Sequence, residues 1–132
     1  MAANLSIFRQ RDFLVATVQL LPTDEDLVGL RNCLLEAVGH HRALGVILDV
    51  SGLDVMDSYS ARVLRDLAQM LRLRGAETVI VGIQPEVAFA MVQLGLRLEG
   101  VETALDIEEG IAYLDRKRGH RQSSSQQQFE YR

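Results

Sequence analysis

Cysteine is almost absent from this chain of 132 residues, which carries Cys33 alone. A single cysteine excludes an internal disulfide, and chains without disulfides are typical of reducing compartments. Cys33 lies on the apolar face of a predicted helix, so we expect it to fill the core rather than to act as a nucleophile. A chain of this length can bury a sizeable hydrophobic core without covalent crosslinks.

Lysine and histidine are also scarce, and their scarcity argues against an enzyme. Lys117 is the only lysine, so the chain has no glycine-rich phosphate loop ending in Gly-Lys-Ser/Thr. His40 and His41 are adjacent at the end of a predicted helix, and His120 lies near the C-terminus. This spacing is typical neither of a metal site nor of a nucleophile, base and acid set. We therefore expect a protein with no catalytic residues, no metal and no cofactor.

Long apolar runs are missing as well. Runs such as residues 44–48 are far too short to cross a bilayer. The N-terminus lacks the basic and then apolar order of a signal peptide. The sequence therefore predicts a soluble cytoplasmic protein that does not contact a membrane.

Charge is unevenly distributed between the body of the chain and its C-terminus. Residues 1–115 hold 9 Lys/Arg against 17 Asp/Glu, a net of −8, whereas residues 116–132 hold five against one. The acidic body argues against nucleic-acid binding, because phosphate contacts need a basic patch. The C-terminal stretch is rich in serine and glutamine and lacks apolar periodicity. We expect one domain over residues 1–116 and a flexible, basic polar tail over residues 117–132.

Hydrophobic periodicity predicts five strands and four helices. Two short strands, at residues 6–9 and 13–18, form an N-terminal hairpin. Four helices then alternate with three strands. The helices are expected from Pro22 or Thr23 to Gly39, from the segment after Asp57 to Gly75, from Gln84 or Pro85 to Gly95, and after a cap at Asp106. In the third helix, Val87, Met91 and Leu94 are expected to face the core. The strands are expected at 45–50, 78–81 and 103–105. This order is typical of an α/β layer fold with a mixed, mostly parallel sheet.

The segment VMDSYSARVLRD, residues 55–66, is the strongest candidate for a functional site. The loop at 51–57 leaves a buried strand at its carboxyl end, where functional residues of parallel sheets gather. It delivers Ser58 to the start of a helix, where free N–H groups and the helix dipole favour an anion such as a phosphate. Arg62 follows one turn later and is within reach of position 58.

Helix capping is the simpler interpretation of the same residues. Either Asp57 or Ser58 would be a preferred N-terminal cap, and the pattern requires nothing further. Capping needs only one such residue, however, whereas this stretch combines several polar side chains around an exposed tyrosine: Asp54, Asp57, Ser58, Tyr59 and Ser60. Both interpretations stay open on the local pattern.

A response-regulator receiver has a similar layout, because Asp49 ends a buried strand as a phosphoacceptor aspartate would. A receiver also needs an acidic pair after its first strand and a lysine after a later strand. Neither is present in this sequence, which argues against the receiver.

Three longer stretches resemble the STAS domains of anti-sigma-factor antagonists: VILDVSGLDVMDSYSARVL, AETVIVGIQPEVAFAMVQLGL and VETALDIEEGIAYL. The resemblance extends over nearly all of residues 5–115. It implies the STAS fold and maps the Asp-Ser pair of that family, whose hydroxyl residue is phosphorylated by a partner kinase, onto Asp57 and Ser58. Simple antagonists typically continue Ser-Gly-Leu, whereas this chain has Tyr59, Ser60 and Ala61. The GIQPEVA segment, and the lack of an N-terminal sensor domain in this chain, are more similar to the small RsbS-type stressosome scaffolds.

The resemblance implies a signalling role without catalysis. RsbS-type scaffolds co-assemble with sensor-bearing RsbR-type STAS paralogues into a large cytoplasmic particle that holds an RsbT-type switch kinase. Under stress the kinase phosphorylates the STAS proteins and is released, and an RsbX-type phosphatase resets the system. The implied phosphorylation site is Ser58, with Asp54, Asp57, Tyr59 and Arg62 as neighbours in partner binding. The alternative is a simple antagonist that binds an anti-sigma factor directly and is switched by phosphorylation of Ser58.

Overall fold

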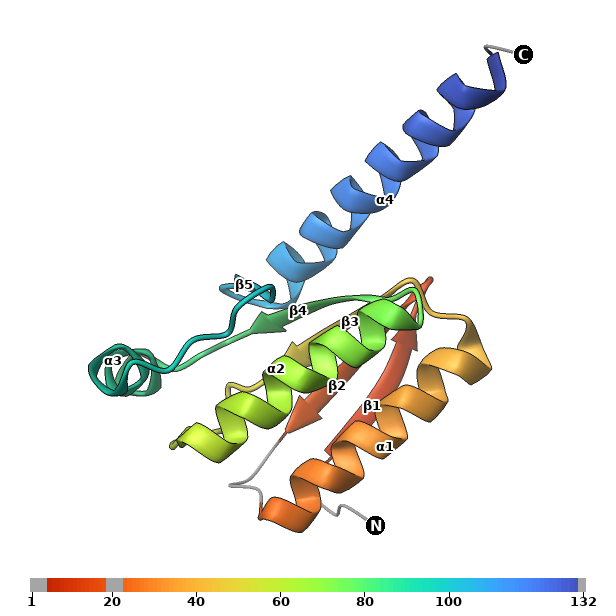
Figure 1. Ribbon diagram of the computed structural model, residues 1–132. Helices are drawn as coiled ribbons and strands as arrows, with labels where there is room; N and C mark the ends of the chain where they lie inside the picture. Colours follow the sequence, from red (N-terminus) through yellow and green to blue (C-terminus); the bar gives the residue numbers. More distant parts are fainter. Residues whose placement is uncertain (1–4, 19–22, 131–132) are drawn as a thin grey trace.

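The computed structural model describes residues 5–18 and 23–130 of the chain. Five strands and four helices form an α/β fold that opens with a hairpin (Figure 1). In chain order they are β1 (Leu5–Gln10), β2 (Phe13–Val18), α1 (Asp24–His41), β3 (Gly45–Asp49), α2 (Ser58–Leu73), β4 (Glu77–Val81), α3 (Pro85–Leu94), β5 (Glu102–Ala104) and α4 (Ile107–Glu130). The predicted fold class is confirmed, although Pro22, predicted near the start of the first helix, lies outside the described residues.

The five strands form one mixed sheet in the order β1-β2-β3-β4-β5. β1 pairs with β2 in antiparallel orientation, and the other neighbouring strands are parallel. Along the parallel part, Thr17 lies beside Asp49, Asp49 beside Val81 and Val81 beside Ala104. The carboxyl ends of these strands therefore share one edge, and the loops that begin α2, α3 and α4 leave from that edge.

Helices cover both faces of the sheet and divide the core into two clusters. α1 and α2 lie side by side along one face, where buried residues such as Leu34, Leu48 and Leu64 pack together (Figure 1). α4 packs on the other face over Val15, Ile47 and neighbouring side chains. Successive side chains along each strand point to opposite faces of the sheet, so the same strands contribute residues to both clusters. The two layers are thus held by separate sets of apolar contacts.

Side-chain caps define where α1 and α4 begin. The hydroxyl of Thr23 accepts a hydrogen bond from the N–H of Asp26 at 3.1 Å, and the Asp26 carboxylate accepts one from the N–H of Thr23 at 3.0 Å. This reciprocal pair is a capping box, and it satisfies two otherwise free donors. At α4, Asp106 accepts from the N–H of Glu109 at 2.9 Å, which confirms the predicted cap.

Two apolar residues predicted to face the core are exposed, so those predictions were wrong. Cys33 is exposed on α1, because it lies about 100° around the helix from the buried Leu34 and outside the buried stripe. Leu94 is 65% exposed at the last turn of α3. α3 projects beyond the end of the sheet (Figure 1), and its buried contacts come from Val87 and Met91.

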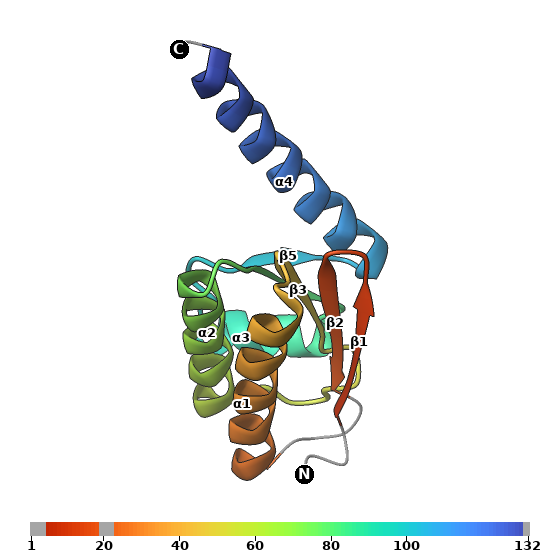
Figure 2. The ribbon, with the colours of Figure 1, turned by 90° about the vertical axis from the view of Figure 1, so that its right-hand side faces the viewer.

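α4 continues as one helix to Glu130 and extends away from the body of the protein (Figures 1 and 2). Its first turns carry the contacts with the sheet, and Leu114 is the buried anchor of that contact. The flexibility predicted for residues 117–132 stays a prediction. Within the described ranges, none of the helices has the length and apolar character required to cross a membrane.

Candidate functional site

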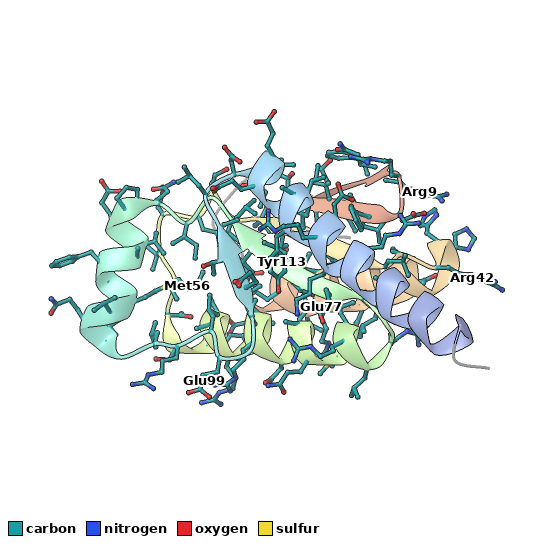
Figure 3. The ribbon with its side chains drawn as sticks, turned by 90° about the horizontal axis from the view of Figure 1, so that it is seen from above. Arg9, Arg42, Met56, Glu77, Glu99 and Tyr113 are labelled. Atoms are coloured by element: carbon teal, nitrogen blue, oxygen red, sulfur yellow. The ribbon has the colours of Figure 1, made fainter. Side chains whose placement is uncertain are left out.

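The loop between β3 and α2 is anchored to the core by two side chains. Leu53 and Met56 are each only 2% exposed. The first residue of the loop adds one hydrogen bond to the pairing of β3 with β4, since the N–H of Val50 donates to the carbonyl of Val81 at 3.0 Å. Met56 lies at the end of the molecule that carries α3 (Figure 3). These anchors hold the start of α2 in a defined position at the carboxyl edge of the sheet.

Gln84 ties this loop to the neighbouring strand. Its side-chain amide donates to the carbonyl of Ser51 at 2.7 Å and to the carboxylate of Asp54 at 3.3 Å. The sequence pattern predicts a helix start at Gln84 but does not indicate this role, because the contact spans 33 residues. Gly82, just before it, has φ of +79° and a Cβ there would lie 3.0 Å from a carboxylate oxygen of Asp49. A side chain at position 82 would therefore push the two loops apart.

Asp57, not Ser58, caps α2. The Asp57 carboxylate accepts a hydrogen bond from the N–H of Ser60 at 2.7 Å. Hydrogen bonds from the backbone and the side chain of Ser60 hold the pKa of Asp57 below its usual value of 3.8. Ser58 is the first residue of the helix, and in the described part of the chain its hydroxyl makes no hydrogen bond. The capping interpretation thus accounts for Asp57 and leaves the Ser58 hydroxyl unexplained.

The surface around Ser58 is accessible and partly apolar. Ser58 is exposed, Tyr59 is 40% exposed and Val55 is 57% exposed. Ser60, by contrast, is half-buried and hydrogen bonded to Asp57. The sequence pattern indicates the exposure of Tyr59 but not that of Val55, although the adjacent Met56 is buried. The exposed serine therefore lies beside apolar side chains that a partner protein can cover.

The structure brings together some of the predicted partner-binding residues and separates others. Ser58 and Arg62 line the same pocket, which has a volume of about 290 Å³. Asp54 does not line this pocket, and its carboxylate instead accepts a hydrogen bond from the side-chain amide of Gln84. Residues around Ser58 thus present carboxylates from the loop and guanidinium groups from the helix.

A matched pair of variants separates the capping role from the role of the hydroxyl. Asp57→Ala should lower the free energy of unfolding by about 1 kcal/mol through loss of the cap. Ser58→Ala should change it by less than about 0.5 kcal/mol, as for ordinary surface substitutions. Thermal melts of both variants test this expectation. A larger loss for Ser58→Ala than for Asp57→Ala would contradict it.

The contribution of the Asp57 cap should also depend on pH. Folding lowers the pKa of Asp57, so the folded state favours the carboxylate. The stabilisation is present above the usual aspartate pKa of 3.8 and is lost as the pH falls through the lower, folded-state pKa. The difference in stability between the parent and Asp57→Ala should therefore shrink in acid, which melts at neutral and acidic pH measure.

Comparison with protein families identifies this arrangement. The family model described as the STAS domain matches residues 27–110. That range contains α2, the loop before it and the two following strands, so the match includes the whole candidate site.

Several similar proteins have names that refer to RsbT, to RsbS or to the stressosome. The RsbT co-antagonist protein RsbRA of Bacillus subtilis is 36% identical over 78 residues, which cover 59% of this chain and 28% of RsbRA. A Ser-to-Glu variant of Moorella thermoacetica RsbS is 28% identical, with a TM-score of 0.73 and coverage of 88% of this chain and 98% of that chain. A chain in a structure of the stressosome is 30% identical, with a TM-score of 0.70 and coverage of 86% and 98%. The chain spans 24% to 36% of the length of the four RsbT co-antagonist proteins that it matches.

Proposed function

Because the chain belongs to the STAS domain family, we propose that it is a non-enzymatic signalling scaffold of a bacterial stressosome. In this role it holds an RsbT-type serine kinase in the cytoplasm and releases it when Ser58 is phosphorylated during the stress response. One observation carries the proposal: Ser58 is exposed at the first position of α2, while the cap is supplied by Asp57.

The relatives support both the assembly and the kinase. The chain covers 98% of an RsbS chain and of a chain in the stressosome structure. Four of the curated relatives are described as RsbT co-antagonist proteins. Co-assembly with RsbR-type paralogues and resetting by an RsbX-type phosphatase complete the proposed cycle. The partner surface consists of Asp54, Asp57, Tyr59 and Arg62 around the serine.

The size of the assembly tests the scaffold role. Mixed with a purified RsbR-type paralogue, the protein should form particles of megadalton size, which light scattering and electron microscopy detect. A monomer or dimer that instead binds an anti-sigma factor would contradict the scaffold and indicate the simple antagonist. The protein alone, without the paralogue, serves as the control for self-association.

The position of the phosphate tests the switch. Incubated with the RsbT-type kinase and ATP, the protein should gain one phosphate at Ser58, and Ser58→Ala should gain none. Ser60 should stay unmodified, because it is half-buried and hydrogen bonded to Asp57. Peptide mapping by mass spectrometry locates the modification. A phosphate on Ser60 or Tyr59 would show that the assignment is wrong.

A further inference from the structure

A pocket of about 290 Å³ opens beside Ser58, between the first two turns of α2 and the connection from α3 to β5. Glu99, on the α3–β5 side of this pocket, lies alongside α2 in Figure 3. The polar residues that line the pocket are Ser58, Arg62, Arg65, Arg97 and Glu99. Three guanidinium groups and one carboxylate thus surround the serine that we propose as the phosphorylation site.

Two separate elements supply the arginines. Arg62 and Arg65 lie four and seven residues after Ser58, so all three share one face of α2. Arg97 comes from the connection that follows α3. That connection turns at Gly95, which has φ of +68° and ends α3 in the left-handed conformation. The turn brings a cation from a distant part of the chain to the start of α2.

Most of this positive charge has no carboxylate partner. In the described part of the chain, Arg62 and Arg97 form no ion pair, and Arg65 makes only a long contact of 3.7 Å with Asp66. Arg72, further along the same helix, instead donates to the carbonyl of Gly100 and lies 3.7 Å from Glu77. The arginines near Ser58 are therefore available for an anion, whereas the arginine two turns later is engaged in the fold.

We propose that this pocket receives the phosphate of phosphorylated Ser58, which pairs with Arg97 and Arg62 of the same chain. The inference rests on the proposed function in taking Ser58 as the phosphoacceptor. In the transfer, the Ser58 oxygen forms a bond to the γ-phosphorus of ATP, and the bond from that phosphorus to the bridging oxygen of ADP breaks. The hydroxyl proton passes to the kinase or to solvent.

The chemistry of the arginine side chain fits this task. A guanidinium group binds two phosphate oxygens at once, and such charge-assisted hydrogen bonds are stronger than neutral ones. The free N–H groups at the start of α2 favour the same anion. Pairing would link α2 to the α3–β5 connection. Glu99 opposes the phosphate, so Glu99→Gln should strengthen the pairing.

The experiment places phosphoserine at position 58 during translation, so that no kinase is needed, and follows the phosphate by ³¹P NMR. Free phosphoserine loses its second proton with a pKa of about 6. In the folded protein we expect that pKa to be lower by about half a unit to one unit, since exposed ion pairs are individually weak. Arg97→Gln and Arg62→Gln should each move the pKa back toward the value measured in urea.

Arg116→Gln is the matched control, because Arg116 is an exposed arginine on α4, on the opposite face of the sheet. It should leave the pKa unchanged. If the phosphate pKa is low but neither Arg97→Gln nor Arg62→Gln alters it, the effect comes from the helix end, and the proposal that the pocket binds the phosphate is wrong. A phosphate pKa equal to that in urea would also overturn the proposal. Failure of the kinase to modify Ser58 would contradict the proposed function. It would not affect the phosphate pKa measurement, because the phosphoserine is introduced without the kinase.

Discussion

Protein phosphorylated at Ser58 is expected to bind the RsbT-type kinase more than a hundredfold more weakly than the unmodified protein. Before modification, two carboxylates and three guanidinium groups lie near the serine: Asp57 and Glu99 against Arg62, Arg65 and Arg97. A phosphate adds about −1.5 to −2 charge. Repulsion and the desolvation of this charge act at the surface where we propose that the kinase docks.

The required change in free energy is modest. A loss of about 3 kcal/mol in binding reduces the affinity by more than a hundredfold. No refolding is needed, because Asp57 rather than Ser58 holds the start of α2. The phosphorylated protein should therefore keep the same backbone fold, which amide chemical shifts report.

Titration calorimetry with the kinase measures this effect. Ser58→Asp is an imperfect mimic with half the charge and should weaken binding less than the phosphate does. Arg62→Ala should increase the loss caused by phosphorylation, because it removes a cation that pairs with the phosphate. Equal affinity of the kinase for the modified and unmodified forms would exclude electrostatic release.

The elements of the fold follow closely from local patterns in the sequence. The strand predicted at residues 13–18 is β2 (Phe13–Val18) in the structure. Its prediction was accurate because its apolar side chains alternate between the two core clusters and form a nearly continuous apolar run. Helix ends were predicted less well: α1 extends two residues past Gly39, to His41. A helical glycine weakens a helix without ending it, and the left-handed turn falls at Arg42 instead.

The candidate site could be predicted only in part. Ser58 and Arg62 are four residues apart, so helical geometry alone places them together. Arg97 and Gln84 reach the same edge of the sheet through turns at Gly95 and Gly82. Nothing local in the sequence specifies which residues meet across such loops. The sequence pattern thus indicates Ser58, the proposed phosphoacceptor, whereas the residues that line the pocket beside it are found only in the tertiary structure.

Replacement of Gly110 is expected to have a large effect on stability, because α4 contacts the sheet there. Gly110 is buried, and a Cβ at this position would lie 3.1 Å from a methyl carbon of Val81 and 3.5 Å from Ile47. Gly110→Leu would force a whole side chain into the apolar cluster under α4. Overpacking of this kind costs about 1–3 kcal/mol. A domain of this size should then melt at a temperature lower by about 3–5 °C for each kcal/mol.

Gly119→Leu is the matched control in the same helix, since a Cβ there meets no atom within 4 Å. Both substitutions improve the helix propensity by a similar amount, so the difference between their melting temperatures isolates the contact with the sheet. Gly110→Leu should melt clearly below the parent, and Gly119→Leu at or above it. Equal shifts at the two positions would show that α4 does not depend on this close approach. Below the melting temperature the kinase should still modify Ser58 in Gly110→Leu, because α1 and α2 pack on the opposite face of the sheet from α4.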